Sequence, residues 1–218
     1  SSDLPLTINL VQAKVPAVLA AWFPGEYGGQ AVAEALFGDL NPGGKLPVTF
    51  PRSVGQIEFN FPAKPASQAG MGKGEDPNGA GNSLVTGALY PFGHGLSYTD
   101  FKYENLKVSP QKIRPGEAVE VSLVVKNSGK RAGDEVVQLY LKDVLASVIP
   151  YEKVLRGFER VSLQPGEKKT VRFRLSRGDM ELIDAKNQRV VESGDFVVEA
   201  GSSSTDIRQT AKFTVAAP

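Results

Sequence analysis

The chain has 218 residues, and its 25 Lys and Arg nearly balance its 24 Asp and Glu, which leaves a formal net charge of +1. This balance excludes the strong basic excess typical of nucleic-acid-binding proteins, and no apolar run approaches the ~18 residues of a membrane span. Because Cys is absent and His94 is the only His, disulfides, thiol catalysis and a two-His zinc site are excluded within this chain, and carboxylates remain as catalytic candidates.

The first residues predict buried strands of an α/β sheet. Leu6–Leu10 and Val18–Phe23 are short apolar runs, too short for helices and typical of parallel strands covered on both faces. Two such strands with one helix would be marginal as a separate core. We therefore expect residues 1–59 to be the C-terminal segment of a larger α/β sandwich domain, whose remainder lies upstream or on another polypeptide.

A helix is predicted over residues 30–37, which are rich in good helix formers. Its apolar residues follow helical spacing and would form one buried face: Val32, Leu36 and Leu40. The pair Gly43-Gly44 is the predicted stop of this helix.

Residues 60–100 read as a Gly/Pro-rich loop and linker. Five Gly fall between Gly70 and Gly81, and loops of this length without secondary structure are usually functional or disordered. The group Glu75-Asp76-Pro77-Asn78-Gly79 clusters oxygens that would suit calcium. It lacks the ligand spacing of an EF-hand, so a turn with exposed acids is the favoured interpretation.

Residues 101–218 read as an all-β sandwich. Alternating apolar residues predict strands at 117–126, 135–142 and 169–175, and further strands begin at Gly194 and Ala211. Pro165-Gly166 is a turn signal. In the 135–142 strand, Val137, Leu139 and Leu141 form the predicted inner face, opposite Val136, Gln138 and Tyr140. Six or seven short strands with regular turns are what a two-sheet sandwich needs.

Several segments, in collinear order, resemble family 3 glycoside hydrolases. The segments Trp22–Gly29 and Ala33–Pro51 are similar to the late part of the family's second domain, and Leu89–Thr99 to the join that leads to its third domain. The segments Val137–Tyr140 and Glu152–Phe158 resemble that third domain. The resemblance implies an α/β fragment followed by a fibronectin type III/immunoglobulin-like sandwich, closest to the β-glucosidase branch.

The resemblance also implies which parts are missing. Family members carry an Asp nucleophile on an N-terminal barrel and a Glu acid/base in the second domain, both upstream of the Trp-Phe-Pro-Gly motif, and no residue here matches either. We therefore expect no catalytic residue, metal or cofactor in this chain, and its substrate-binding residues are unassigned. The expected partners are the upstream barrel and α/β segments, and a glycoside bound through the parent enzyme.

The parent enzyme would be a retaining β-glucosidase that acts on terminal β-D-glucosyl residues, with its two carboxyl groups ~5–5.5 Å apart. This chain would complete the acid/base-bearing domain, with residues 60–88 at the rim of the pocket. Alternatives are the same role in a β-xylosidase or α-arabinofuranosidase, or a stand-alone carbohydrate-binding or spacer module. A periplasmic or secreted location is expected, by analogy with enzymes that carry such a sandwich.

Four single residues have a functional and a structural interpretation. Glu26 would be a catalytic carboxylate or, as favoured, an acid near the positive end of a helix. His94 would be a general base or substrate contact or, as favoured, a packing residue at the domain join. Trp22 and Tyr27 would stack on a sugar or, as favoured, belong to the core. The basic stripe on and beside the 169–175 strand is expected to be a solvated face: Lys168, Lys169, Arg172, Arg174 and Arg177.

Overall fold

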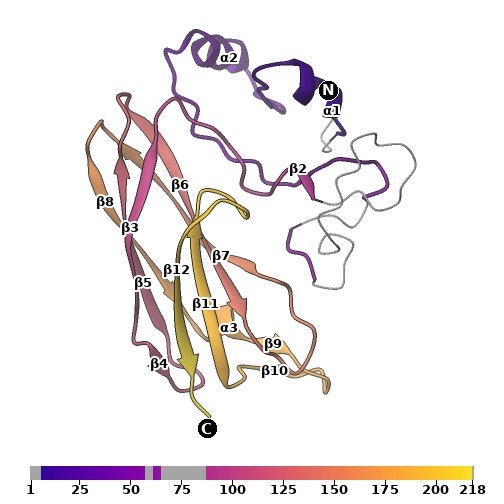
Figure 1. Ribbon diagram of the computed structural model, residues 1–218, viewed down its shortest axis with the longest axis vertical. Helices are drawn as coiled ribbons and strands as arrows, with labels where there is room; N and C mark the ends of the chain where they lie inside the picture. Colours follow the sequence, from indigo (N-terminus) through magenta and orange to yellow (C-terminus); the bar gives the residue numbers. More distant parts are fainter. Residues whose placement is uncertain (1–5, 57–60, 65–86, 218) are drawn as a thin grey trace.

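The computed structural model describes residues 6–56, 61–64 and 87–217. Two β-sheets packed face to face form its larger part (Figure 1). The first sheet has the strand order β4-β12-β11-β6-β7: β4 (Lys112–Ile113), β12 (Ile207–Val215), β11 (Gly194–Gly201), β6 (Gly133–Asp143) and β7 (Val154–Leu163). The second has the order β3-β5-β8: β3 (Phe101–Ser109), β5 (Val119–Asn127) and β8 (Lys168–Leu175). Neighbouring strands are antiparallel except for β4 and β12.

The core of the sandwich follows the predicted alternation. In β5, Val119, Val121, Leu123 and Val125 are fully buried, and alternate residues of β6, β8, β11 and β12 complete the core. Phe196 and Phe213 stack between neighbouring strands, with ring centroids 5.3 Å apart. Gly166 has a φ of 81°, the left-handed conformation that this turn requires and that Gly adopts without strain. The predicted sandwich fold is confirmed.

The basic stripe is solvated, as expected. All five of its residues are exposed, and four of them form ion pairs at the surface, such as Lys168 with Glu104 and Arg174 with Glu120. A short helix, α3 (Arg177–Met180), follows β8 and is capped at Ser176. Strands β9 (Leu182–Ile183) and β10 (Arg189–Val190) then form a small hairpin.

The residues before the sandwich form a small α/β piece. It contains α1 (Asn9–Lys14), α2 (Gly28–Phe37), and a short ribbon that pairs β1 (Phe50–Pro51) with β2 (Ala88–Tyr90). The helix predicted over residues 30–37 is confirmed. Its predicted stop at Gly43-Gly44 is wrong, because the helix ends at Phe37 and Gly38 caps it with a φ of 85°. No helix within residues 6–56, 61–64 and 87–217 is long and apolar enough to span a membrane.

The strands predicted at 6–10 and 18–23 are wrong for this structure. Residues 9 and 10 belong to α1, and residues 18–23 form neither helix nor strand. A buried parallel strand exists only beside neighbours that accept and donate its backbone hydrogen bonds. No described segment pairs with either run, so these apolar residues have no sheet to join among the described residues.

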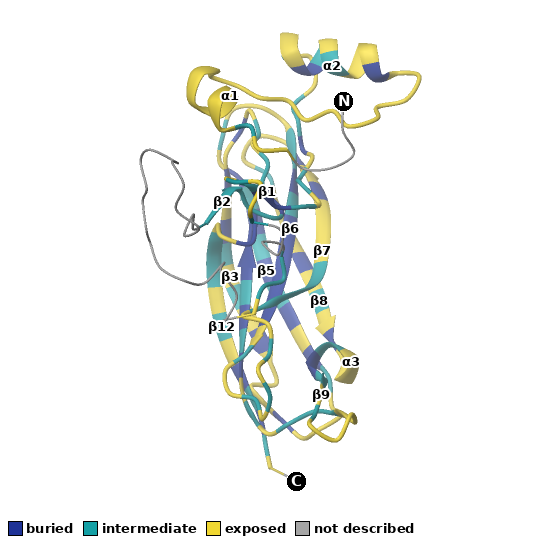
Figure 2. Cartoon of the chain, turned by 90° about the vertical axis from the view of Figure 1, so that its right-hand side faces the viewer, coloured by how far each residue is buried: buried dark blue, intermediate teal, exposed yellow. Residues whose placement is uncertain are grey.

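Much of this piece is exposed to solvent (Figure 2), and its exposed residues include several large apolar ones. We define this N-terminal apolar surface as Leu10, Phe23, Tyr27, Leu36 and Phe37, of which Phe37 is 86 % exposed. Burying a side chain of this size contributes ~1.5–3 kcal/mol. An exposed set of this extent is typical of a surface that another protein segment covers.

Candidate functional site

The candidate site is the junction between the α/β piece and the sandwich. We define the junction as residues 41–50 and 87–99 together with the sandwich residues that they contact. The two segments are joined to each other by backbone hydrogen bonds, from Leu46 N to the His94 carbonyl (2.8 Å) and from Gly93 N to the Leu46 carbonyl (2.8 Å). Ser204, in the β11–β12 turn, donates from its backbone N to the Phe92 carbonyl (3.0 Å).

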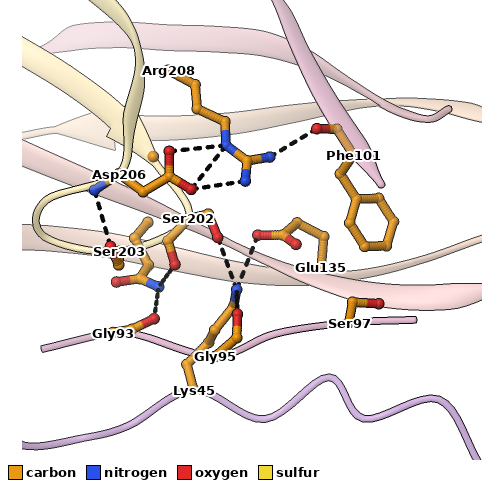
Figure 3. A network of polar contacts seen from close by, with 12 residues as sticks. Lys45, Gly93, Gly95, Ser97, Phe101, Glu135, Ser202, Ser203, Asp206 and Arg208 are labelled. Carbon is orange, nitrogen blue, oxygen red and sulfur yellow. Dashed lines mark hydrogen bonds and ion pairs between the residues drawn. The ribbon is translucent and has the colours of Figure 1, made fainter. Parts of the chain in front are cut away.

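Lys45 lies at the centre of the junction (Figure 3). Its Nζ donates to the Gly95 carbonyl at 3.0 Å and to Ser202 Oγ at 2.9 Å, and it lies 3.5 Å from Glu135 Oε1. The Lys45 and Glu135 side chains are only 11 % and 3 % exposed. Burial lowers the pKa of Lys45, and the Glu135 carboxylate opposes that shift. Such a pair costs desolvation energy that hydrogen bonds must offset, and here it ties residue 45 to β6.

Glu135 connects Lys45 to a second group of polar side chains. The Tyr103 hydroxyl donates to Glu135 Oε1 at 3.0 Å. Burial raises the pKa of Tyr103 far above its usual value, and the Glu135 charge adds to this shift. Arg208 lies over the Tyr103 ring, 5.0 Å from its centroid, and its Nη2 is 2.8 Å from Asp206 Oδ2. We call Lys45, Glu135, Tyr103, Arg208 and Asp206 the Lys45 network.

Asp206 is held as a carboxylate by its arginine partner. The hydrogen bond from Arg208 lowers the pKa of Asp206, against the opposing effect of burial. Arg208 also donates from Nη1 to the Phe101 carbonyl at 2.8 Å, where β3 begins. The network therefore spans both sheets and the segment that carries Lys45.

The outer face of β6 is buried under the junction. Gln138 donates from Nε2 to the carbonyls of Gly93 (3.1 Å) and Ser202 (2.7 Å). Phe61 packs edge-on against the Tyr140 ring at 5.4 Å and stacks on Phe92 at 4.7 Å. The predicted alternation of β6 is correct, but Gln138 and Tyr140 are fully covered because these segments lie on the sheet. Both faces of β6 are thus buried over residues 137–141.

Gly93 makes this close approach possible. Its φ is 79°, and a Cβ built on it would lie 1.9 Å from Gln138 Oε1. Any larger residue would push the 87–99 segment away from the sheet. The helix α2 is attached at the same place, since the Tyr98 hydroxyl donates to the Ala35 carbonyl (2.7 Å) and Arg131 Nη2 to the Gly38 carbonyl (2.6 Å).

The residues singled out from the sequence do not come together. Glu26 is exposed, two residues before α2, and Trp22 lies edge-on to Phe50 at 6.1 Å. Tyr27 is exposed, so its expected core role is wrong, because no described segment covers the N-terminus of α2. The possible calcium group at 75–79 lies outside the described residues. Among the described residues, no group of three His, Asp or Glu side chains could hold a metal.

His94 lies in the junction, where the sequence placed it. Its ring stacks on Tyr90 at 5.2 Å with an interplanar angle of 21°. Burial lowers the pKa of His94 below 6.5, the nearby Lys45 charge lowers it further, and Asp206 raises it. The ring is therefore neutral at pH 7 and serves packing.

The single histidine makes this junction measurable by NMR. We expect the His94 ring to titrate below pH 6.5 in the folded chain and near 6.5 in urea. Because the unfolded chain then binds the proton more tightly, the contribution of His94 to stability is complete above about pH 6.5 and falls as the pH drops through the folded pKa. A midpoint at or above that of the urea-unfolded chain would contradict the buried environment.

Sequence reasoning missed the Lys45 network, although one signal was present. Glu135 has the same parity along β6 as Val137, Leu139 and Leu141, which are all buried. A carboxylate at a position whose parity places it among buried apolar residues predicts a buried partner that carries a positive charge or donates hydrogen bonds. Nothing comparable marks Lys45, since its partner is 90 residues away in the sequence.

The comparisons with known proteins agree with this architecture. Residues 1–98 match the glycosyl hydrolase family 3 C-terminal domain, and residues 135–204 match the fibronectin type III-like domain. The chain is 42% identical over 212 residues to a β-xylosidase of Formosa agariphila, covering 97% of this chain and 28% of that protein. It is 40% identical over 214 residues to a periplasmic β-glucosidase of Salmonella typhimurium, covering 94% of this chain and 27% of that protein.

Solved structures give the same result. A β-glucosidase from Erythrobacter marinus superposes with a TM-score of 0.87 at 41% identity, covering 97% of this chain and 27% of that one. A β-glucosidase from Listeria innocua in complex with glucose gives a TM-score of 0.85 at 33% identity, with 98% and 30% covered. The chain thus spans between a quarter and a third of the length of these relatives. It belongs to glycosyl hydrolase family 3, of which it carries the C-terminal α/β segment and the fibronectin type III-like sandwich.

Proposed function

We propose that this chain is the C-terminal, non-catalytic portion of a retaining β-glucosidase that hydrolyses terminal β-D-glucosyl residues. Its role is to complete the acid/base-bearing α/β domain and to hold that domain on the sandwich. The observation that carries the proposal is the N-terminal apolar surface, which is exposed on a piece that the junction fixes firmly to the sandwich. This surface fits a segment whose covering partner is the upstream part of the enzyme.

The carboxylates discussed above support a non-catalytic role. Glu135 is buried under Lys45 and Tyr103, where a sugar ring cannot reach it. Asp206 is held in an ion pair with Arg208. Glu26 is exposed in the turn before α2. A retaining mechanism needs two carboxyl groups facing one bond, and we assign both to the upstream part.

A β-xylosidase is the second candidate for the parent enzyme. Two relatives, at 42% and 41% identity, are named β-xylosidase and putative β-xylosidase. Relatives named β-glucosidase reach 42% and 40%. The residues of the pocket determine which sugar is bound, and we place that pocket in the upstream segments. This chain is therefore compatible with either a β-glucosidase or a β-xylosidase. An α-arabinofuranosidase and a free-standing module stay alternatives from the sequence.

Two finer expectations stay predictions. The proposed contribution of residues 60–88 to the pocket rim depends mainly on residues 65–86, which lie outside the described part of the chain. A periplasmic or secreted location is proposed by analogy with the Salmonella typhimurium relative, whose name places it in the periplasm.

The purified chain should show no turnover of an aryl β-glucoside or an aryl β-xyloside. The physical reason is the assignment of both catalytic carboxyl groups to the upstream part. The assay compares the chain with buffer and with a Glu26→Gln variant. Hydrolysis above buffer that disappears in the variant would place catalysis in this chain and end the proposal.

A further inference from the structure

Phe158, on the outer face of β7 at the edge of the junction, is left uncovered by the described residues. Phe158 pairs with Gln138 across the sheet, so the two side chains share the face on which Gly93 and Phe61 lie. Gln138 is buried there, whereas Phe158 is 69 % exposed. The α/β piece therefore covers the outer face of β6 but does not cover Phe158 on β7, the neighbouring strand at the edge of the sheet.

Arg156, two residues before Phe158 on the same strand, adds a polar feature to this face. The β6–β7 register shifts between Leu139 and Tyr140, which makes Arg156 the extra residue of a β-bulge. Its Nε is buried and has no hydrogen-bond partner, and no described residue forms an ion pair with it. Buried guanidinium nitrogens are normally satisfied by a carboxylate, a carbonyl or water.

The contacts on both sides of Phe158 show which parts of the chain lie next to this face. Above Phe158 along β7, Arg160 is paired with Asp134 at 2.6 Å. In the connection before β7, the Ala63 carbonyl accepts a hydrogen bond from Glu152 N (2.9 Å), and Lys64 lies 5.9 Å from the Tyr151 ring centroid. Segments that precede the sandwich thus lie beside the connection that leads into β7, and, through Gly93 and Phe61, over the neighbouring strand β6.

From this continuity we propose that the outer face of β7 is a second docking surface for the upstream part of the same enzyme. Phe158 provides the apolar contact, and a carboxylate of the upstream part pairs with Arg156. The inference rests on the proposed function, because it takes the upstream part as the partner. It adds a contact made by the sandwich itself, separate from the N-terminal apolar surface.

The test is hydroxyl-radical footprinting with mass spectrometry on the 218-residue chain and on the full-length enzyme that contains it. Docking should reduce the exposure of Phe158 from 69 % to below about 10 %, as in the core of an interface, and its oxidation by about sevenfold. Ile183, exposed on β9, is the internal control and should be oxidised equally in both proteins. Equal oxidation of Phe158 in both would overturn the inference.

The same experiment separates this inference from the proposed function. Protection of Phe37 and Tyr27 without protection of Phe158 would leave the proposed function standing and end the second docking surface. Absence of protection at all three would contradict both. Protection of Phe158 in the chain alone, increasing with its concentration, would assign the face to a second copy and overturn the inference.

Matched variants of the full-length enzyme test the carboxylate. Arg156→Met keeps the aliphatic stem and removes the charge, and should raise Phe158 oxidation by about twofold or more as a charge pair is lost from the interface. Arg172→Met, on the exposed face of β8 in the other sheet, should leave it unchanged. If Phe158 is protected equally in both variants, no carboxylate pairs with Arg156 and that part of the proposal is wrong.

Discussion

Replacement of Lys45 by Met should lower the free energy of unfolding of the chain by about 3–5 kcal/mol, the usual cost of leaving one member of a buried ion pair alone. Met keeps most of the apolar stem, so the loss reports the ammonium group. Without it, the buried Glu135 carboxylate loses its ion pair and keeps the hydrogen bond from Tyr103. Urea unfolding at pH 7, followed by circular dichroism, measures the change.

Two further variants identify the cause of that loss. Lys168→Met breaks the ion pair between Lys168 and Glu104, two side chains that are 51 % and 36 % exposed. This variant should lower the free energy of unfolding by no more than about 1 kcal/mol. The double variant Lys45→Met/Glu135→Leu removes both charges and should regain at least half of the loss, because apolar replacements of buried pairs are often neutral. A Lys45→Met effect no larger than that of Lys168→Met would show that the junction does not depend on this pair.

The fold of the sandwich was predictable because its strands obey one simple rule. Every second residue of β5 is buried between two sheets, so Val119, Val121, Leu123 and Val125 have the period that the sequence shows. The same rule misjudged the environment of Gln138 and Tyr140. Alternation gives the face of a side chain but does not reveal that a distant segment covers that face.

The α/β piece was less predictable because the described residues supply no sheet for its apolar runs. An apolar run such as residues 18–23 becomes a strand only beside a sheet, and no described segment supplies one. The end of α2 was misplaced because Gly38, just after Phe37, adopts the left-handed cap before Gly43 is reached. Gly43 has a different use, since a Cβ there would lie 2.8 Å from Asp134 Cβ. It allows the chain to pass close to the start of β6.

The candidate site was the least predictable part. His94 could be placed at the domain join from the sequence, but the contacts that link Lys45 to Glu135, Glu135 to Tyr103 and Tyr103 to Arg208 join residues far apart in the chain. Only the phase of Glu135 along β6 hinted at a buried charge. The division at residues 59/60 and 100/101 stays a prediction. The junction nevertheless shows that residues 41–50 and 87–99 pack on the sandwich.

Reconstitution should switch activity on, which is the largest effect that the proposed function predicts. The upstream polypeptide, produced alone, would lack the segment that completes its α/β domain. Its acid/base Glu would then be held poorly, and misplacement of such a group by about 1 Å can reduce the rate by two orders of magnitude. The proposed function assigns no catalytic carboxylate to the isolated chain, so each of the two polypeptides alone should be inactive or nearly so.

The direct measurement is the rate of aryl β-glucoside hydrolysis as the upstream polypeptide is titrated with this chain. An aryl β-xyloside is run in parallel to identify the sugar. We predict that activity on one of the two substrates rises from near zero and saturates at one chain per upstream polypeptide. A Gly93→Val variant, which cannot seat the 87–99 segment on Gln138, should require more chain to reach the same rate. Full activity of the upstream polypeptide without the chain would contradict the proposed role of this chain.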